Sequence, residues 1–394
     1  MANWSEILDD IIDLFLQKLP PVVEEFARFG SVCKSWRASA CNRKQQHCVH
    51  FAPWLMLAKK DDDEKISEDN EEGIRSFYSI SSKRIFNLKL PTKGRRCWGT
   101  SYGWVVTMGL DLNINLLNPL SGRQISLPSQ LMFEHQYRCH VEPQYMCRSF
   151  IRKFAIASNS FDDQCPTVMA IHGEFCALAF ATPRDKSWTS LEGRLAENTT
   201  DVIYFKDHFY AVDNHGRLRV CEMSVTPPIA EEIASPPNCV SPTNTFYLVE
   251  ISGELHLVER VFYEENEDID GGQSRIGDIG KEDKINMLSL LYVTNYILVF
   301  KFDFHTRKWT EIDDLGEHAL FVGNNASFCI STSDYPEFKG NCVYFTDDNK
   351  DVYTYGYCDM GVYDIKEDSV KPIYADEDKL SQFSRPLFFI PTCP

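Results

Sequence analysis

The chain has 394 residues, which is enough for two domains of unequal size. Its net charge of −17 repels a phosphate backbone and argues against nucleic-acid binding. No apolar run is long enough to cross a bilayer, and no basic start precedes an apolar stretch, so we expect neither a membrane protein nor an exported one. Aromatic residues make up 13% of the chain, which favours β structure because these side chains fit a pleated surface.

Residues 3–40 predict three short helices. Apolar residues recur at helical spacing through the first of them, and Pro20 with Pro21 separates it from the second. Gly30 is suited to end the second helix, and Ser31 can cap the third. Because so short a segment cannot bury all of its own apolar surface, the remaining face packs either on the rest of the chain or on another protein.

The motifs in this segment resemble the F-box of plant F-box proteins, most specifically in Val32-Cys33-Lys34-Ser35-Trp36-Arg37. The resemblance implies docking on a Skp-type adaptor and, through it, on a cullin ubiquitin ligase. It also implies nine residues that form or support the adaptor-facing surface: Leu8, Ile11, Ile12, Phe15, Leu19, Pro20, Val32, Cys33 and Trp36. The family usually has Leu-Pro where this chain has Ile7-Leu8, a departure that would move the helix start and alter adaptor affinity. The alternative is a plain helical cap on the following domain.

The 14 cysteines include no Cys-x-x-Cys pair. The nearest groupings, Cys41 and Cys48 beside His47, and Cys139 with Cys147, lack the spacing of a zinc site. We therefore expect reduced and mostly buried thiols, with no metal and no cofactor.

From Ser76 onward, short apolar runs alternate with turn residues such as Asn214-His215-Gly216. Turns this short indicate hairpins and therefore antiparallel sheets. The pattern of four strands recurs loosely every 40 to 50 residues or so, which is typical of a propeller blade. Residues 51–394 have room for about seven such units, or about six with long insertions. Two charge-rich stretches, residues 59–72 and 264–272, are expected to be loops.

The run from Asn118-Pro119 to Leu127-Pro128 and the apolar strand at residues 54–57 resemble the kelch-like β-propeller behind the F-box in the plant KIB group. The fold expected is mainly β with a small α N-terminal domain, a three-helix F-box followed by a β-propeller of about six or seven blades. We assign residues 1–44 to the F-box domain, 45–50 to a linker and 51–394 to the propeller. The stretch at residues 385–391 is expected to be a final strand that closes the ring near Trp54.

Motifs for a serine nucleophile elbow, a phosphate loop and a zinc protease are all absent from the sequence. The sequence therefore predicts a non-catalytic, cytoplasmic or nuclear protein, namely the substrate-recognition subunit of a Skp–cullin–F-box ubiquitin ligase. Its propeller would bind an unknown target protein. Two alternatives stay open: a propeller scaffold with a non-functional F-box, and a propeller hydrolase with carboxylates converging on the axis.

Overall fold

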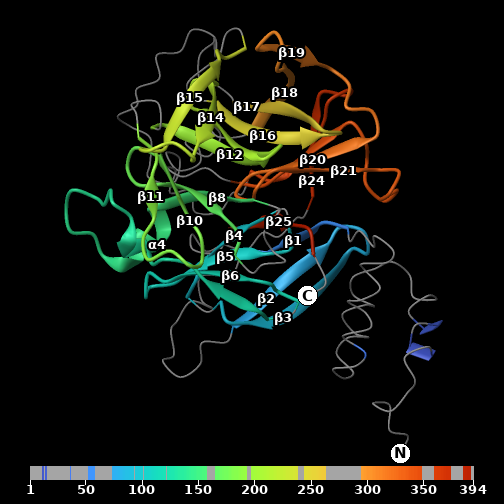
Figure 1. Ribbon diagram of the computed structural model, residues 1–394. Helices are drawn as coiled ribbons and strands as arrows, with labels where there is room; N and C mark the ends of the chain where they lie inside the picture. The colour runs from blue at the N-terminus through green and yellow to red at the C-terminus, as the bar shows by residue number, and fades with distance from the viewer. Residues whose placement is uncertain are drawn as a thin grey trace, which may run out of the picture.

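The computed structural model describes residues 11–12, 14–15, 36, 52–57, 73–92, 94–100, 102–120, 122–157, 165–192, 197–237, 244–262, 294–347, 359–373 and 385–391. In this part of the chain, six β-sheets stand around a common axis, so the fold is a six-bladed β-propeller (Figure 1). The blade count falls within the range that the sequence predicted.

The first three blades come from the two ends of the chain and from its first half. Blade 1 holds β25 (Leu387–Phe389), β1 (Trp54–Met56), β2 (Gly73–Ser79) and β3 (Arg84–Leu90). Blade 2 holds β4 (Arg96–Gly99), β5 (Val105–Met108), β6 (Ile114–Leu117) and β7 (Gln124–Ser126). Blade 3 holds β8 (Ile151–Ile156), β9 (Val168–His172), β10 (Ala177–Ala181) and β11 (Thr189–Ser190).

The other three blades follow in chain order. Blade 4 holds β12 (Thr199–Phe205), β13 (His208–Asp213), β14 (Leu218–Glu222) and β15 (Ile229–Ala234). Blade 5 holds β16 (Thr245–Ile251), β17 (Glu254–Phe262), β18 (Thr294–Asp303) and β19 (Lys308–Ile312). Blade 6 holds β21 (Phe328–Ser331), β20 (His318–Val322), β22 (Cys342–Phe345), β23 (Gly361–Asp364) and β24 (Ser369–Pro372).

The strand nearest the axis comes first in each of these lists, because contacts between neighbouring blades run through those strands, as between β8 and β12, β12 and β16, and β25 and β4. Six buried apolar clusters fill the six spaces between neighbouring blades. Each blade is therefore apolar on both faces, and closing the ring is what buries both.

The ring closes where β25 pairs with β1 in antiparallel register, with Trp54 opposite Phe389 and Met56 opposite Leu387. This confirms the final strand that the sequence predicted near Trp54. The ring of Trp54 stacks on Phe86 at 5.5 Å between centroids and meets Phe389 edge-on at 6.0 Å. Aromatic packing of this kind adds to the burial of the first and last strands of the fold.

Blade 6 departs from the expected hairpins. Its strand β22 pairs with β20 in parallel, while β20 also pairs with β21 in an antiparallel hairpin. The expectation of purely antiparallel sheets is therefore wrong for this pair. The reason is that the chain turns inward after β20, so that β21 takes the axial position. The chain then returns past β20, and β22 pairs with the other edge of β20 in parallel.

Two short helices, η3 (Gln130–Met132) and α4 (Pro143–Ser149), lie between blades 2 and 3. Pro143 occupies the start of α4, where its fixed φ fits and its missing N–H costs nothing. Met146, Cys147 and the following Phe150 are buried in the cluster between the two blades. Among the helices that the structure describes, none has the length and apolarity of a membrane span.

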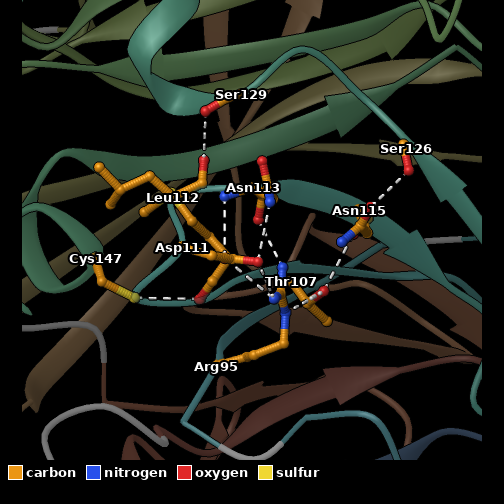
Figure 2. A network of polar contacts seen from close by, with 10 residues as sticks. Arg95, Thr107, Asp111, Leu112, Asn113, Asn115, Ser126, Ser129 and Cys147 are labelled. Atoms are coloured by element: carbon orange, nitrogen blue, oxygen red, sulfur yellow. Dashed lines mark hydrogen bonds and ion pairs between the residues drawn. The ribbon is translucent and has the colours of Figure 1, made fainter. Parts of the chain in front are cut away.

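A polar network fixes the turn between β5 and β6 in blade 2 (Figure 2). Nη1 of Arg95 lies 3.2 Å from both carboxylate oxygens of Asp111, and Nη2 donates to the carbonyl oxygen of Asn113 at 2.6 Å. Gly109 lets the guanidinium approach, since a Cβ there would lie 2.8 Å from Nη1. The network is local and exposed, so it stabilises the turn modestly.

Candidate functional site

A half-open cavity of about 400 Å³ lies on the axis of the propeller, at the carboxyl ends of the inner strands. Ile156 reaches it from β8, Tyr204 from β12, Glu250 from β16 and Ser331 from β21. The inner strands all point the same way along the axis, so one end of the ring collects a side chain from nearly every blade. We call this space the axial cavity.

The floor of the axial cavity is a segment at residues 324–327 that crosses the axis. The backbone N–H of Ala326 donates to the carbonyl oxygen of Gly99 in blade 2 at 2.9 Å, and the side-chain oxygen of Asn325 accepts from the N–H of Phe388 in blade 1 at 3.2 Å. Ser327 Oγ donates to Asp201 Oδ2 in blade 4 at 3.3 Å. The segment therefore ties blade 6 to three other blades and closes the axis below the cavity.

A buried ion pair supports this floor. Nζ of Lys153 lies 2.7 Å from Asp201 Oδ1, and Asp201 also accepts the backbone N–H groups of Val202 at 2.7 Å and Leu248 at 2.8 Å. Burial raises the pKa of the Asp201 carboxyl, while Lys153 and these hydrogen bonds oppose that rise. A fully buried pair held by backbone donors from two blades is a structural tie, and it brings no net charge to the cavity.

One wall of the cavity is fixed by a contact between blades 5 and 6. Nδ1 of His318 lies 2.9 Å from the carbonyl oxygen of Leu315, and Nε2 lies 3.0 Å from Oγ of Ser252. A carbonyl oxygen can only accept, so Nδ1 donates to Leu315, and Nε2 forms a hydrogen bond with the serine hydroxyl. These two contacts orient the imidazole and hold the turn after β16 against β20.

Glu250 differs from the other residues around the cavity. Its side chain is exposed, and no described residue forms a hydrogen bond or an ion pair with its carboxylate. Among the described residues that line the cavity it is the only carboxylate, and none of them is a lysine or an arginine. Burial raises the pKa of the Cys329 thiol in the cavity wall to about 12, and the negative charge of Glu250 adds to this rise.

Two half-buried tyrosines line the cavity, Tyr102 from blade 2 and Tyr204 from blade 4. The hydroxyl of Tyr204 lies 3.4 Å from Oδ1 of Asp207, and its ring packs edge-on against Phe209 at 5.0 Å between centroids. Burial, with Asp207 beside it, raises the pKa of Tyr204. The phenol therefore stays neutral and presents an aromatic surface to the cavity.

The described N-terminal residues divide into two groups. Ile11, Leu14 and Phe15 are 43%, 56% and 49% exposed, and their spacing places them on one side of a helix. Ile12 and Trp36 are buried and belong to the apolar cluster that holds Trp54, Met56 and Phe77 of blade 1. The rings of Phe15 and Trp36 stack at 6.4 Å between centroids. We call Ile11, Leu14 and Phe15 the exposed trio.

The sequence-predicted adaptor surface is thus described only in part. Of the nine residues, Ile11 and Phe15 are exposed, Ile12 and Trp36 are buried, and five lie outside the described residues: Leu8, Leu19, Pro20, Val32 and Cys33. The linker at residues 45–50 and the charged stretches at 59–72 and 264–272 also lie outside them. The domain boundaries at residues 44 and 51 stay predictions.

Sequence reasoning missed Leu14 and every residue of the axial cavity. Leu14 was not among the apolar positions assigned to the first helix, although it stands three residues after Ile11 and so fits the helical spacing. For the cavity a signal does exist in the first hairpin of blades 4 and 5. Tyr204 and Glu250 each stand two residues before the turn, at Lys206 and Ser252, near the end of the inner strand of the blade.

Residues 77–364 match the KIB1-4 beta-propeller family. The chain belongs to this family. The relatives of this KIB1-4 propeller include "F-box protein SKIP23" of Arabidopsis thaliana, which is 25% identical across 99% of this chain and 95% of its own length. "Putative F-box protein At5g55150" of the same plant is 24% identical across 95% of this chain and 93% of its own. "F-box protein At2g17036", also of Arabidopsis thaliana, is 23% identical across 99% of this chain and 94% of its own length.

These findings confirm the resemblance that the sequence motifs indicated, a plant F-box protein with a KIB-type propeller. The relatives match nearly the whole KIB1-4 chain, including the segment before the propeller that carries the exposed trio.

Proposed function

We propose that this protein is the substrate-recognition subunit of a Skp–cullin–F-box ubiquitin ligase. The observation that carries the proposal is the match of F-box proteins along almost the entire chain, together with an exposed apolar trio in the segment that has the F-box motif. An apolar helix face that stays open to solvent is a typical docking surface for another protein.

The mechanism is proximity. The N-terminal helices hold a Skp-type adaptor and thereby a cullin, while the propeller holds the target near a ubiquitin-charged conjugating enzyme. Holding the target close raises the local concentration of its lysines, so the receptor itself needs no catalytic group. The proposal also places the protein in the cytoplasm or the nucleus, which a fluorescent fusion can test.

The test is co-expression with a Skp-type adaptor, followed by capture of the tagged receptor. We expect wild-type protein to retain the adaptor, and the double variant Ile11→Asp with Phe15→Asp to lose it by at least about tenfold, because two charges would then face an apolar partner surface. Both residues are exposed, so the variant should still fold. Trp36→Ala is a poorer choice because Trp36 is buried.

Ile85→Asp is the matched control. Ile85 is 48% exposed on the outer strand β3, which puts an equivalent charge on the propeller and away from the exposed trio. Adaptor capture that survives the double variant would contradict the proposed docking surface. A wild-type chain that never retains the adaptor would favour the alternative of a scaffold with a non-functional F-box, which the Ile7-Leu8 departure motivates.

The hydrolase alternative has less support from the axial cavity. Glycoside hydrolysis needs two carboxyl groups on either side of one bond. The described lining offers one, Glu250, and Asp201 lies below the floor in its ion pair with Lys153. Within the described residues, no group of three or more His, Cys, Asp and Glu side chains is placed to hold a metal ion.

A further inference from the structure

The axial cavity carries a charge that no described residue of the protein balances. Glu250 is the next-to-last residue of the inner strand β16 and follows four buried residues, yet no described residue forms an ion pair with it. On the next strand, by contrast, Glu254 is paired with Lys301 at 2.5 Å. A carboxylate at the mouth of a partly enclosed space attracts a cation more strongly than one on an open surface, because the walls exclude water.

The surroundings of Glu250 also suit a cation. Tyr102 and Tyr204 present aromatic surface to the same space, and aromatic faces attract ammonium and guanidinium groups. The apolar part of the lining, which includes Ile156 and Ile203, can pack on the aliphatic stem of a long side chain. A cavity of about 400 Å³ is within the usual range for binding sites.

The same features disfavour an anionic ligand. The described lining holds no lysine or arginine, and both ring nitrogens of His318 are already engaged, by Leu315 and Ser252. Lys153 below the floor is already paired with Asp201. A phosphate or a carboxylate would therefore meet Glu250 with no described cation to offset the repulsion. The net charge of −17 acts in the same direction over longer range, steering basic segments toward the protein.

We infer that the axial cavity binds a lysine or arginine side chain of the target protein, with Glu250 as its counter-ion and Tyr102 and Tyr204 as its aromatic walls. This inference rests on the proposed function, because it names the chemistry of the target segment that the receptor selects. Target recognition then begins with a basic residue that inserts along the propeller axis, while loops around the rim read the neighbouring residues.

The test uses a display library of random peptides, panned against the full-length protein. Wild-type receptor should enrich peptides with lysine or arginine at one fixed position. Glu250→Gln should remove that preference and weaken binding of an enriched peptide by at least about tenfold, since the charge is lost while the shape is kept. Glu250→Lys should reverse the preference toward acidic residues.

Glu254→Gln is the matched control, because it removes an exposed carboxylate from the following strand, outside the described lining of the cavity. It should enrich the same basic peptides as the wild type. A wild-type selection without a basic position, or one that Glu250→Gln leaves unchanged, would overturn the inference.

Adaptor capture is measured on the same proteins, and Glu250→Gln should retain it. A wild-type protein that fails to capture the adaptor would count against the proposed function. A wild-type protein that captures the adaptor but shows no preference for basic peptides would count against the axial site alone.

Discussion

Buried polar side chains in this propeller do structural work that their residue types alone do not reveal. Asp201 joins a lysine from blade 3, a backbone N–H from blade 5 and a serine from blade 6. Arg260 does the same between blades 5 and 6, donating to Thr294 Oγ1 at 2.7 Å and pairing with Asp359 at 2.7 Å. Each such group is costly to bury alone and is tolerated because partners from several blades surround it.

His172 is the residue whose burial should be visible in solution. Its ring is fully buried on β9, with Phe133 at 4.3 Å and Phe150 at 5.5 Å between centroids, and neither ring nitrogen is hydrogen-bonded to a described residue. Burial, with a smaller contribution from His135, lowers its pKa from an ordinary 6.5 to about 3. The folded protein therefore keeps this imidazole neutral at a pH where the unfolded chain protonates it.

The sign of the effect follows from that difference. As pH falls from about 6.5 toward about 3, His172 binds a proton in the unfolded state but not in the folded state. The free energy of unfolding therefore falls by up to about 1.4 kcal/mol per pH unit. We expect His172→Phe to remove this part of the acid sensitivity in urea denaturation at pH 7 and pH 5. The exposed His208→Phe serves as control, and an unchanged pH dependence in His172→Phe would contradict the assignment.

At the scale of elements, blade 6 shows how one glycine makes an unusual arrangement possible. Gly323 follows β20 with a φ of +131°, and a Cβ there would overlap Oγ1 of Thr346. This residue leads directly into the segment at 324–327 that forms the cavity floor. Backbone freedom at one position thus allows β20 to end, the floor to cross the axis, and β21 to take the inner position.

Gly323→Ala should therefore destabilise the protein by at least about 2 kcal/mol, from backbone strain together with the overlap at Thr346. Gly122→Ala is the comparison. It has a φ of +72° in a turn with open space around it, so its expected cost is about 1 kcal/mol. Thermal unfolding of both variants measures the difference. Equal costs would mean that the approach of Thr346 does not constrain this position.

At the scale of the whole molecule, stability comes from closing the ring. The six clusters between blades form a circuit, and the one between blades 6 and 1 contains Leu55 and Phe388 from opposite ends of the propeller. A β-sheet with a missing inner strand leaves an unpaired edge and two exposed apolar faces. Each blade therefore depends on the others through its neighbours.

A chain that ends at residue 384 tests this dependence, because it lacks β25. Leu387, Phe388 and Phe389 are all fully buried, so their loss removes about 5 to 9 kcal/mol of apolar burial. We expect loss of the cooperative unfolding transition in circular dichroism. A chain that ends at residue 391 keeps β25 and should unfold like the full-length protein. Closure by β25 would be dispensable if both truncations unfolded alike.

The sequence by itself determined the class of this protein. Alternating apolar runs and short turns predicted β blades, the motif at residues 118–128 indicated the KIB-type propeller, and the apolar stretch near the C-terminus predicted the closing strand. These features are local, since they depend on period, turn chemistry and composition within one segment. The closing strand, expected within residues 385–391, is β25 at Leu387–Phe389.

The tertiary structure alone decided the number of blades, the parallel pair in blade 6, the floor across the axis and the cavity that Glu250 lines. Each depends on contacts between residues far apart in the chain, such as Asn325 with Phe388 and Ser327 with Asp201. A local pattern fixes which face of a strand is apolar, whereas which strand ends meet on the axis depends on how the whole ring closes.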